Sequence, residues 1–183
     1  MSEAPGINDD HVLQKFGNLR DVRLGLSAEV RHHSVTALNR LLAHAMAMRD
    51  LYKKAHWQTS GATFYELHTM FDAHYTEQLE IVDTLAERVQ TLGGVSLATS
   101  QDVVSESRIA RAPRDRESPL AQLKRLAEAH EFLLAEARPL ARAAADHGDD
   151  GTNDLLVSNV IRPNEKQAWF VAEHLAGGRH TRE

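Results

Sequence analysis

The sequence predicts an all-α protein in which four long helices form a bundle, with one long crossover connection between the second and third helices. Three observations support this prediction. Apolar residues repeat at helical spacing over four long segments, and no segment alternates with the period of two that marks a strand. Short turns join the first helix to the second and the third to the fourth, whereas residues 95–117 separate the second from the third.

The size and composition are typical of one soluble domain. The chain has 183 residues, of which 42% are hydrophobic and 26% are charged. We expect a flexible N-terminal tail over residues 1–27, the bundle over residues 28–178 and a short C-terminal tail over residues 179–183. No apolar run approaches the roughly 20 residues that span a bilayer, and the first residues lack the pattern of a secretory signal. These features predict a cytoplasmic protein with no membrane partner.

The absence of cysteine limits the kinds of metal site that the chain can form. Disulfides and thiolate sites are excluded, so any metal must be held by His, Asp or Glu. Such ligands favour iron, manganese or zinc over copper(I) or an iron–sulfur cluster. The formal net charge of -5 argues against a uniformly basic surface for nucleic acid.

The first helix is expected from about Ser34 to about Gln58, and the second from Thr63 to residues 93–94. Thr63 and Glu66 have the spacing of a capping box, in which the two side chains bond to each other's backbone amides. The glycines at 93 and 94 tolerate the left-handed conformation that ends a helix. The positions expected to face the core are Leu38, Leu41, Leu42, Ala45, Met48, Leu67, Phe71, Leu79, Val82, Ala86 and Val89.

After the crossover, whose length leaves room for a short helix, the third helix is expected to begin at Ser118. This residue is a good helix cap, and the proline that follows it suits the first helical position. The helix should end near His147, with a kink or interruption at Pro139. Its apolar stripe is Leu120, Leu123, Leu126, Phe132, Leu133, Ala137, Leu140 and Ala144.

Residues 149–153 are expected to form a tight acidic turn, and the fourth helix to run from about Asp154 to about Ala176. Pro163 should kink or interrupt it. Its inward positions are predicted at Leu155, Leu156, Val160, Ile161, Trp169, Ala172 and Leu175. Four helices with one long crossover have the ferritin-like topology.

Five candidate metal ligands lie in the first two helices: His56, His68, Asp72, Asp83 and Glu87. With His68 as the origin, Asp72, Asp83 and Glu87 lie at about 40°, 60° and 100° around the second helix, and therefore on one face. Along the helix axis, however, the pair His68/Asp72 is roughly 22 Å from the pair Asp83/Glu87, at 1.5 Å per residue. No single metal or dimetal centre spans that distance.

Two arrangements satisfy this geometry. Either the chain holds two separate half-sites, or the helix face pairs with a second copy of itself running antiparallel about a two-fold axis. In the second case His68 and Asp72 of one subunit meet Asp83 and Glu87 of its mate, and His56 adds a further nitrogen. The plainer alternative is a solvated helix face, because Asp, Glu and His four residues apart are common on helix surfaces.

Several other conspicuous residues have simple structural interpretations. His74 and the pair His32 and His33 are expected on the surface. Trp57 and Trp169 occur at helical spacing and are expected to pack in the core.

Several motifs resemble those of the Dps family of mini-ferritins, the DNA-binding proteins from starved cells. The resemblance covers roughly residues 34–176 and includes every position of the family's iron-oxidising site. The matching stretches are Leu51-Tyr52-Lys53-Lys54-Ala55-His56-Trp57, Gly61-Ala62-Thr63-Phe64, Leu67-His68, Phe71-Asp72, Asp83 with Ala86-Glu87-Arg88, residues 148–156 and residues 165–170.

The resemblance implies a hollow homododecamer built from two-fold dimers. Such proteins oxidise Fe(II), usually with hydrogen peroxide rather than dioxygen, and store ferric mineral inside the shell. It also implies two iron ions per intersubunit site, with His56, His68 and Asp72 from one chain and Asp83 and Glu87 from the other. Asp72 and Glu87 are expected to bind the tighter iron.

Further residues gain expected roles from the same resemblance. Lys53, one turn before His56, is a candidate partner for a site carboxylate, with a solvated lysine as the plainer alternative. Trp57 would pack near the site or quench a stray radical. Asp149, Asp150 and Asp154 resemble the acidic lining of the family's three-fold pore, where a negative field would concentrate iron. A simpler explanation for Asp154 is a helix N-terminus, which favours acids.

Three functional hypotheses follow. The favoured one is a ferroxidase and iron-storage cage that protects against oxidative stress. The second is a DNA-coating protein associated with the nucleoid, and the third is a purely structural helical oligomer or an iron-independent binding module. DNA binding is expected to be weak or absent, because the cationic residues Lys15, Arg20 and Arg23 are outnumbered within residues 1–30 by five acids: Glu3, Asp9, Asp10, Asp21 and Glu29.

Overall fold

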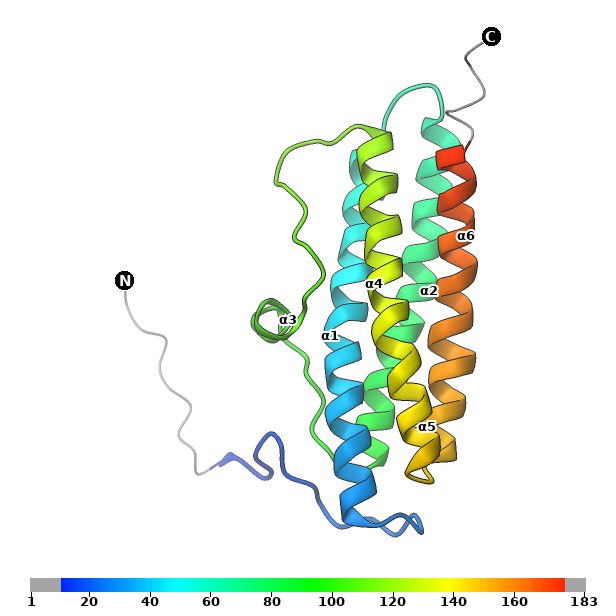
Figure 1. Cartoon of the computed structure of the whole chain (residues 1–183). Coiled ribbons are helices and arrows are strands. Elements are labelled where there is room, and N and C mark those ends of the chain that lie inside the picture. Colours follow the sequence, from blue (N-terminus) through cyan, green and yellow to red (C-terminus); the bar gives the residue numbers. More distant parts are fainter. Residues whose placement is uncertain (1–10, 177–183) are drawn as a thin grey trace.

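The computed structural model describes residues 11–176. Four helices run side by side as a bundle: α1 (Ala28–Gln58), α2 (Phe64–Thr91), α4 (Pro119–Asp146) and the last helical stretch of the chain (Figure 1). That stretch consists of α5 (Asp150–Leu155), the π-helical turn η2 (Leu156–Ile161) and α6 (Arg162–Ala176). No strand occurs within residues 11–176, so the predicted all-α bundle with one crossover is confirmed.

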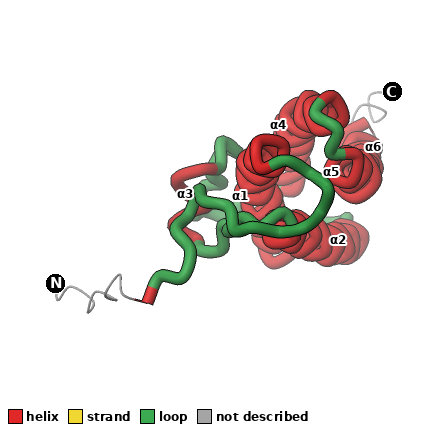
Figure 2. Tube along the Cα trace, turned by 90° about the horizontal axis from the view of Figure 1, so that it is seen from below, coloured by secondary structure: helices red, strands yellow, loops and turns green. Residues whose placement is uncertain are grey.

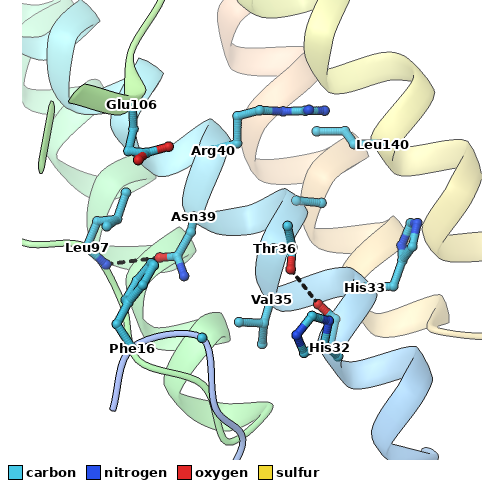
Figure 3. A pocket seen from close by; sticks show the side chains of 12 residues that line it. Phe16, His32, His33, Val35, Thr36, Asn39, Arg40, Leu97, Glu106 and Leu140 are labelled. Carbon is cyan, nitrogen blue, oxygen red and sulfur yellow. Dashed lines mark hydrogen bonds between the residues drawn. The ribbon is translucent and has the colours of Figure 1, made fainter. Parts of the chain in front are cut away.

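The crossover between α2 and α4 contains the short helix α3 (Ser100–Glu106), which lies outside the bundle beside α1 (Figures 1 and 2). Thr99 and Asp102 begin α3 with a capping box. Asn39 of α1 fixes the start of the crossover, since its amide donates to the carbonyl of Val95 and accepts from the amide of Leu97 (Figure 3). None of the helices in the described part of the chain is long and apolar enough to cross a membrane.

The helix ends agree with the prediction in part. Ser118 caps α4 through the amide of Ala121, as expected. The interruption allowed for at Pro139 does not occur, because α4 continues through this residue. The prediction of a capping box at the start of α2 is wrong, because Thr63 is not in the extended conformation and its side chain accepts no capping hydrogen bond. Helix α1 begins at Ala28, with Ser27 as its cap, rather than near Ser34. Its first turn is too polar to show an apolar repeat in the sequence.

The fourth helix differs most from its expected form. It begins at Asp150 rather than Asp154, because Asp149 caps it. The expected interruption at Pro163 takes the form of the π-helical turn η2 directly before it, and the chain stays helical throughout. Proline has no amide hydrogen and clashes with the preceding turn, so regular α-helical hydrogen bonding fails at this point.

Residues 11–27, expected to belong to a flexible tail, follow a defined path against the end of α2. The amide of Arg20 and the side-chain amide of Gln14 both donate to the carbonyl of Gly93. The buried guanidinium of Arg31 donates to the carbonyls of Arg20 and Leu92. The rest of the predicted N-terminal tail and the tail over residues 179–183 lie outside the described residues.

Gly93 is the point where this N-terminal segment meets the bundle, and we expect Gly93→Ala to be destabilising. Gly93 has a φ of +86°, and a Cβ there would lie 2.7 Å from the backbone oxygen of Arg20. The expected loss in the free energy of unfolding is about 2–4 kcal/mol. Gly61→Ala is the matched control, because Gly61 also has a positive φ, +97°, but an open surrounding. It should lose about 1 kcal/mol. Urea unfolding of both variants measures the difference, and equal losses would contradict the steric argument.

The core of the bundle consists of two apolar clusters separated by a layer of polar side chains. One cluster includes Leu38, Leu42 and Leu85, and the other includes Met48, Phe71 and Leu126. Between them, from α2, α4 and α6, lie the buried side chains of His74, Gln78, His130, Asn164 and Gln167. This layer contacts Tyr52 of α1.

Candidate metal centre

Two histidines lie against each other where α1 ends and α2 begins. The rings of His56 and His68 stack with their centroids 3.8 Å apart and an interplanar angle of 22°. Nδ1 of His56 is 2.9 Å from the carbonyl oxygen of His68, and Nδ1 of His68 is 2.9 Å from the carbonyl oxygen of His56. The hydrogen bonding is therefore reciprocal and couples the two helices directly.

These hydrogen bonds determine the chemical form of both rings. A carbonyl oxygen can only accept, so each Nδ1 must carry the hydrogen. In the neutral ring, Nε2 then keeps its lone pair. Histidines that bind metals commonly have this arrangement, with one nitrogen donating to a backbone carbonyl and the other facing the metal. His56 and His68 are thus both suited to bind a metal through Nε2.

Asp72 lies one turn after His68, beside the histidine pair. Its Oδ1 is 3.7 Å from Nε2 of His56 and 2.8 Å from Nζ of Lys53. The hydrogen bond from Lys53 lowers the pKa of Asp72, and the nearby histidines act in the same direction. The carboxylate is 49% exposed, so it remains open to a cation from solution. Lys53, whose Nζ also lies 4.3 Å above the ring centre of Tyr75, holds Asp72 in position.

Asp83 and Glu87 do not join the histidines within one chain. Both are exposed on α2, further toward its C-terminal end. Among residues 11–176 of a single chain, no three His, Asp or Glu side chains are close enough to hold a metal. Asp83 lies in a groove of 600 Å³ along α1 and α2, whose other lining side chains include the apolar Leu42, Met46, Leu79, Val82 and Ala86.

The expectation that both tryptophans pack in the core is wrong. Trp57, next to His56, is 70% exposed, and Trp169 is 59% exposed with its indole N–H donating to Glu173. Phe64 and Tyr65, in the first turn of α2, are also exposed. Two exposed aromatic side chains, those of Trp57 and Phe64, thus adjoin the histidine pair.

Of the three predicted pore residues, Asp149 is buried and Asp150 and Asp154 are exposed. The carboxylate of Asp149 accepts hydrogen bonds from Arg88, Ser34 and Thr152. It therefore joins α1, α2 and the cap of α5 and cannot line a pore. Asp150 and Asp154 are exposed, so the pore hypothesis depends on these two residues.

His32 and His33 are exposed on α1, as expected, and border a groove of 490 Å³ between α1 and the N-terminal segment (Figure 3). The ring of His33 stacks on His147, with centroids 4.3 Å apart. His74, by contrast, was expected on the surface and is buried, with Nδ1 3.2 Å from the hydroxyl of Tyr52. The prediction for His74 is therefore wrong.

Burial has a consequence for the stability of the protein in acid. It is the main cause that lowers the pKa of His44 to about 4 and that of His130 to about 3. Both histidines are neutral in the folded chain, whereas in the unfolded chain they bind protons below about pH 6.5. The unfolded state therefore binds more protons as the pH falls from there toward 4, and stability falls with it.

We expect each of these two histidines to cost up to about 1.4 kcal/mol of unfolding free energy per pH unit in this window. Urea unfolding at about pH 7 and about pH 5, at one protein concentration, measures the loss. His130→Gln should reduce the pH dependence, and His32→Gln, at an exposed position, should leave it unchanged. A stability that is the same at both pH values would contradict the prediction.

Comparisons with known proteins agree with this fold. The ferritin-like domain family matches residues 35–180. The structure of DpsC from Streptomyces coelicolor has a TM-score of 0.89 and 48% sequence identity, covering 90% of this chain and 96% of that chain. The Dps structure from Vibrio cholerae O1, described as a member of the ferritin-like diiron-carboxylate superfamily, has a TM-score of 0.79 and 28% identity, covering 86% and 99%.

A curated relative leads to the same family. The DNA protection during starvation protein of Brevibacillus brevis is 30% identical over 138 residues, which are 75% of this chain and 91% of the relative. The chain is therefore a ferritin-like helical protein. Within that class it belongs to the Dps family.

Proposed function

We propose that this protein is a Dps-like ferroxidase and iron-storage protein. It oxidises Fe(II) with hydrogen peroxide at dinuclear sites shared by two subunits. It stores ferric mineral in a hollow homododecamer and so protects against oxidative stress. The observation that carries the proposal is the reciprocal bonding of His56 and His68, which leaves two Nε2 lone pairs beside the carboxylate of Asp72.

The shared site follows from the spacing along α2. A two-fold axis across the middle of the helix brings His68 and Asp72 of one subunit opposite the Asp83 and Glu87 of its mate, and creates two such sites per dimer. The groove around Asp83, which is lined in part by apolar side chains of α1 and α2, supports this arrangement, because a second copy of α2 would cover it.

The ligand types suit the substrate. Neutral imidazoles bind Fe(II), and the carboxylates of Asp72, Asp83 and Glu87 stabilise the higher charge of Fe(III) as it forms. Two Fe(II) ions supply the two electrons that reduce one peroxide to water, so no hydroxyl radical is released. Asp150 and Asp154, exposed near the start of the last helix, would attract iron toward a pore between subunits.

The test is an anaerobic Fe(II) titration of the purified protein, followed by one peroxide for every two irons. Ferric absorbance and native mass are recorded together. Rapid oxidation that saturates at two irons per site, in a particle of twelve chains, is the expected result. Oxidation no faster than in buffer, in an intact particle, would overturn the ferroxidase proposal.

DNA coating is the second candidate, because relatives such as that of Brevibacillus brevis are named for DNA protection. The charge of residues 1–30 counts against it, since acids outnumber Lys and Arg there. We expect weak or no binding near neutral pH. A gel shift of supercoiled DNA at several salt concentrations decides the question, and a strong shift that salt abolishes would favour the DNA-coating function.

A further inference from the structure

The hydroxyl of Tyr52 lies inside the bundle between two histidines. Tyr52 is 0% exposed, and its Oη is 2.5 Å from Nε2 of His130 and 3.2 Å from Nδ1 of His74. We propose that Tyr52 is a redox-active residue that supplies one electron to peroxide when the metal centre holds too little Fe(II), with His130 accepting the phenolic proton. This inference rests on the proposed ferroxidase function.

The hydrogen-bond partners determine which way the phenolic hydrogen points. Nδ1 of His130 is 3.1 Å from Oδ1 of Asn164, and the amide nitrogen of Asn164 donates to the carbonyl of Val160. Oδ1 of Asn164 is therefore an acceptor, so Nδ1 of His130 carries the hydrogen and its Nε2 is free to accept. Tyr52 donates to that Nε2, and His74 completes the environment by donating to the phenol oxygen.

Hydrogen bonds of the polar layer between the two apolar clusters connect His130 to a carboxylate at the bundle surface. Gln78 donates to Asn164 and to the side-chain oxygen of Gln167, and Gln167 donates to Glu77. Burial alone would raise the pKa of Glu77, but hydrogen bonds from Gln167 and Lys166 outweigh it and lower the pKa. Glu77 is therefore ionised, and its negative charge acts on Tyr52 and His74.

In the resting protein Tyr52 is protonated and His130 is neutral. The loss of an electron from Tyr52 is therefore coupled to the transfer of its proton. Burial, followed by the charge of Glu77, raises the pKa of Tyr52 well above its usual value, so the phenol stays protonated. Burial keeps His130 neutral. An electron leaving Tyr52 would place a positive charge in the apolar core unless the proton leaves with it. His130 is positioned to take that proton over a single hydrogen bond.

Tyr52 is also close to the candidate metal centre. It precedes His56 by four residues on α1, a rise of about 6 Å along the helix axis. The ring of Phe71, the neighbour of Asp72 in sequence, has its centroid 6.2 Å from that of Tyr52. Trp57 is nearer to His56 in sequence but is 70% exposed, so a radical there would be open to solution.

The reaction balances when one Fe(II) and one tyrosine each supply one electron to the same peroxide. Fe(II) loses one electron and becomes Fe(III). Tyr52 loses one electron and its O–H hydrogen, which becomes the proton on Nε2 of His130, and a neutral tyrosyl radical remains. Peroxide takes both electrons, its O–O bond breaks, and two protons from solvent complete two water molecules. A later reductant, such as a second Fe(II), returns Tyr52 to the phenol when His130 gives the proton back.

Electron paramagnetic resonance of the full chain tests the inference. The protein is loaded with one Fe(II) per site, mixed with peroxide and frozen. We expect a tyrosyl signal that changes its hyperfine pattern when the protein contains ring-deuterated tyrosine. The chain has three tyrosines, so the double variant Tyr65→Phe/Tyr75→Phe retains only Tyr52 and should keep the signal. Tyr52→Phe should lose it, and His130→Gln, a side chain of similar reach without a basic nitrogen, should reduce or abolish it.

Iron oxidation is measured separately, so that a failure of the Tyr52 proposal can be distinguished from a failure of the ferroxidase proposal. With two Fe(II) per site, Tyr52→Phe should oxidise iron at the wild-type rate. Normal oxidation without a tyrosyl signal at one Fe(II) per site would overturn the role of Tyr52 and leave the ferroxidase intact. If iron is not oxidised at all, metal-free protein is oxidised instead with a photogenerated ruthenium(III) tris-bipyridine complex. A radical on Tyr65, Tyr75 or Trp57 rather than on Tyr52 would then overturn the inference.

Discussion

Replacing Asp83 and Glu87 together with alanine is expected to abolish peroxide-driven Fe(II) oxidation and leave the bundle folded. In the proposed dimer these two carboxylates are the whole contribution of the second subunit to each site. Without them the imidazoles of His56 and His68 and the carboxylate of Asp72 remain, which is too little negative charge to stabilise Fe(III). Stopped-flow ferric absorbance should show oxidation no faster than in protein-free buffer.

The fold should tolerate this change because both side chains are exposed. Exposed substitutions of this kind usually alter stability by no more than about 0.5 kcal/mol each. Glu128→Ala/Glu131→Ala is the matched control, since it removes two exposed carboxylates from α4, away from the site. It should oxidise iron normally. Full activity in Asp83→Ala/Glu87→Ala would exclude the intersubunit site and leave only a half-site at the histidines.

Asp149→Ala should cause the largest loss of stability among the single substitutions considered. The carboxylate is 1% exposed and accepts from Arg88 of α2, from Ser34 of α1 and from the backbone and hydroxyl of Thr152. Burial alone would raise the pKa of Asp149, but these hydrogen bonds and the charge of Arg88 outweigh it, so the pKa is lowered. Removing the carboxylate leaves Arg88 without its buried partner, and we expect a loss of about 3–5 kcal/mol.

Urea or thermal unfolding of the variant at one protein concentration measures this loss. Asp150→Ala is the control, because the neighbouring carboxylate has the same charge but is exposed. Its loss should stay within about 1 kcal/mol, the usual contribution of an acid in the first turn of a helix. Similar stabilities for the two variants would mean that the interaction of Asp149 with Arg88 contributes little.

The positions of several helices along the chain could be predicted because local sequence signals mark where they begin and end. Ser118 before a proline predicted the start of α4, and Gly93 with its positive φ marks the end of α2. The start of α1 could not be predicted in the same way. Arg31 is buried there only because the carbonyls of Arg20 and Leu92, from two distant segments, accept its hydrogen bonds.

The inward positions were predicted less well, and the errors have one cause. Leu79 and Trp169 were placed in the core by their hydrophobicity, yet both are exposed. Gln78 and Gln167 occupy the core instead, bonded to each other. Helical phase could have identified Gln78, since it continues the buried repeat that passes through His74 and Ile81. A buried amide is favourable only when its partners are present, and those partners come from other helices.

The sequence by itself determined the ligand types, the four-helix topology and the distance that separates His68 and Asp72 from Asp83 and Glu87 along one helix. These follow from residue chemistry and from the constant rise of an α-helix. Only the tertiary structure decided that His56 and His68 orient each other and that Asp149 is a buried structural acid rather than a pore residue. It also decided that Tyr52 meets His130, because hydrogen bonds between distant segments depend on how the helices pack and have no counterpart in local sequence.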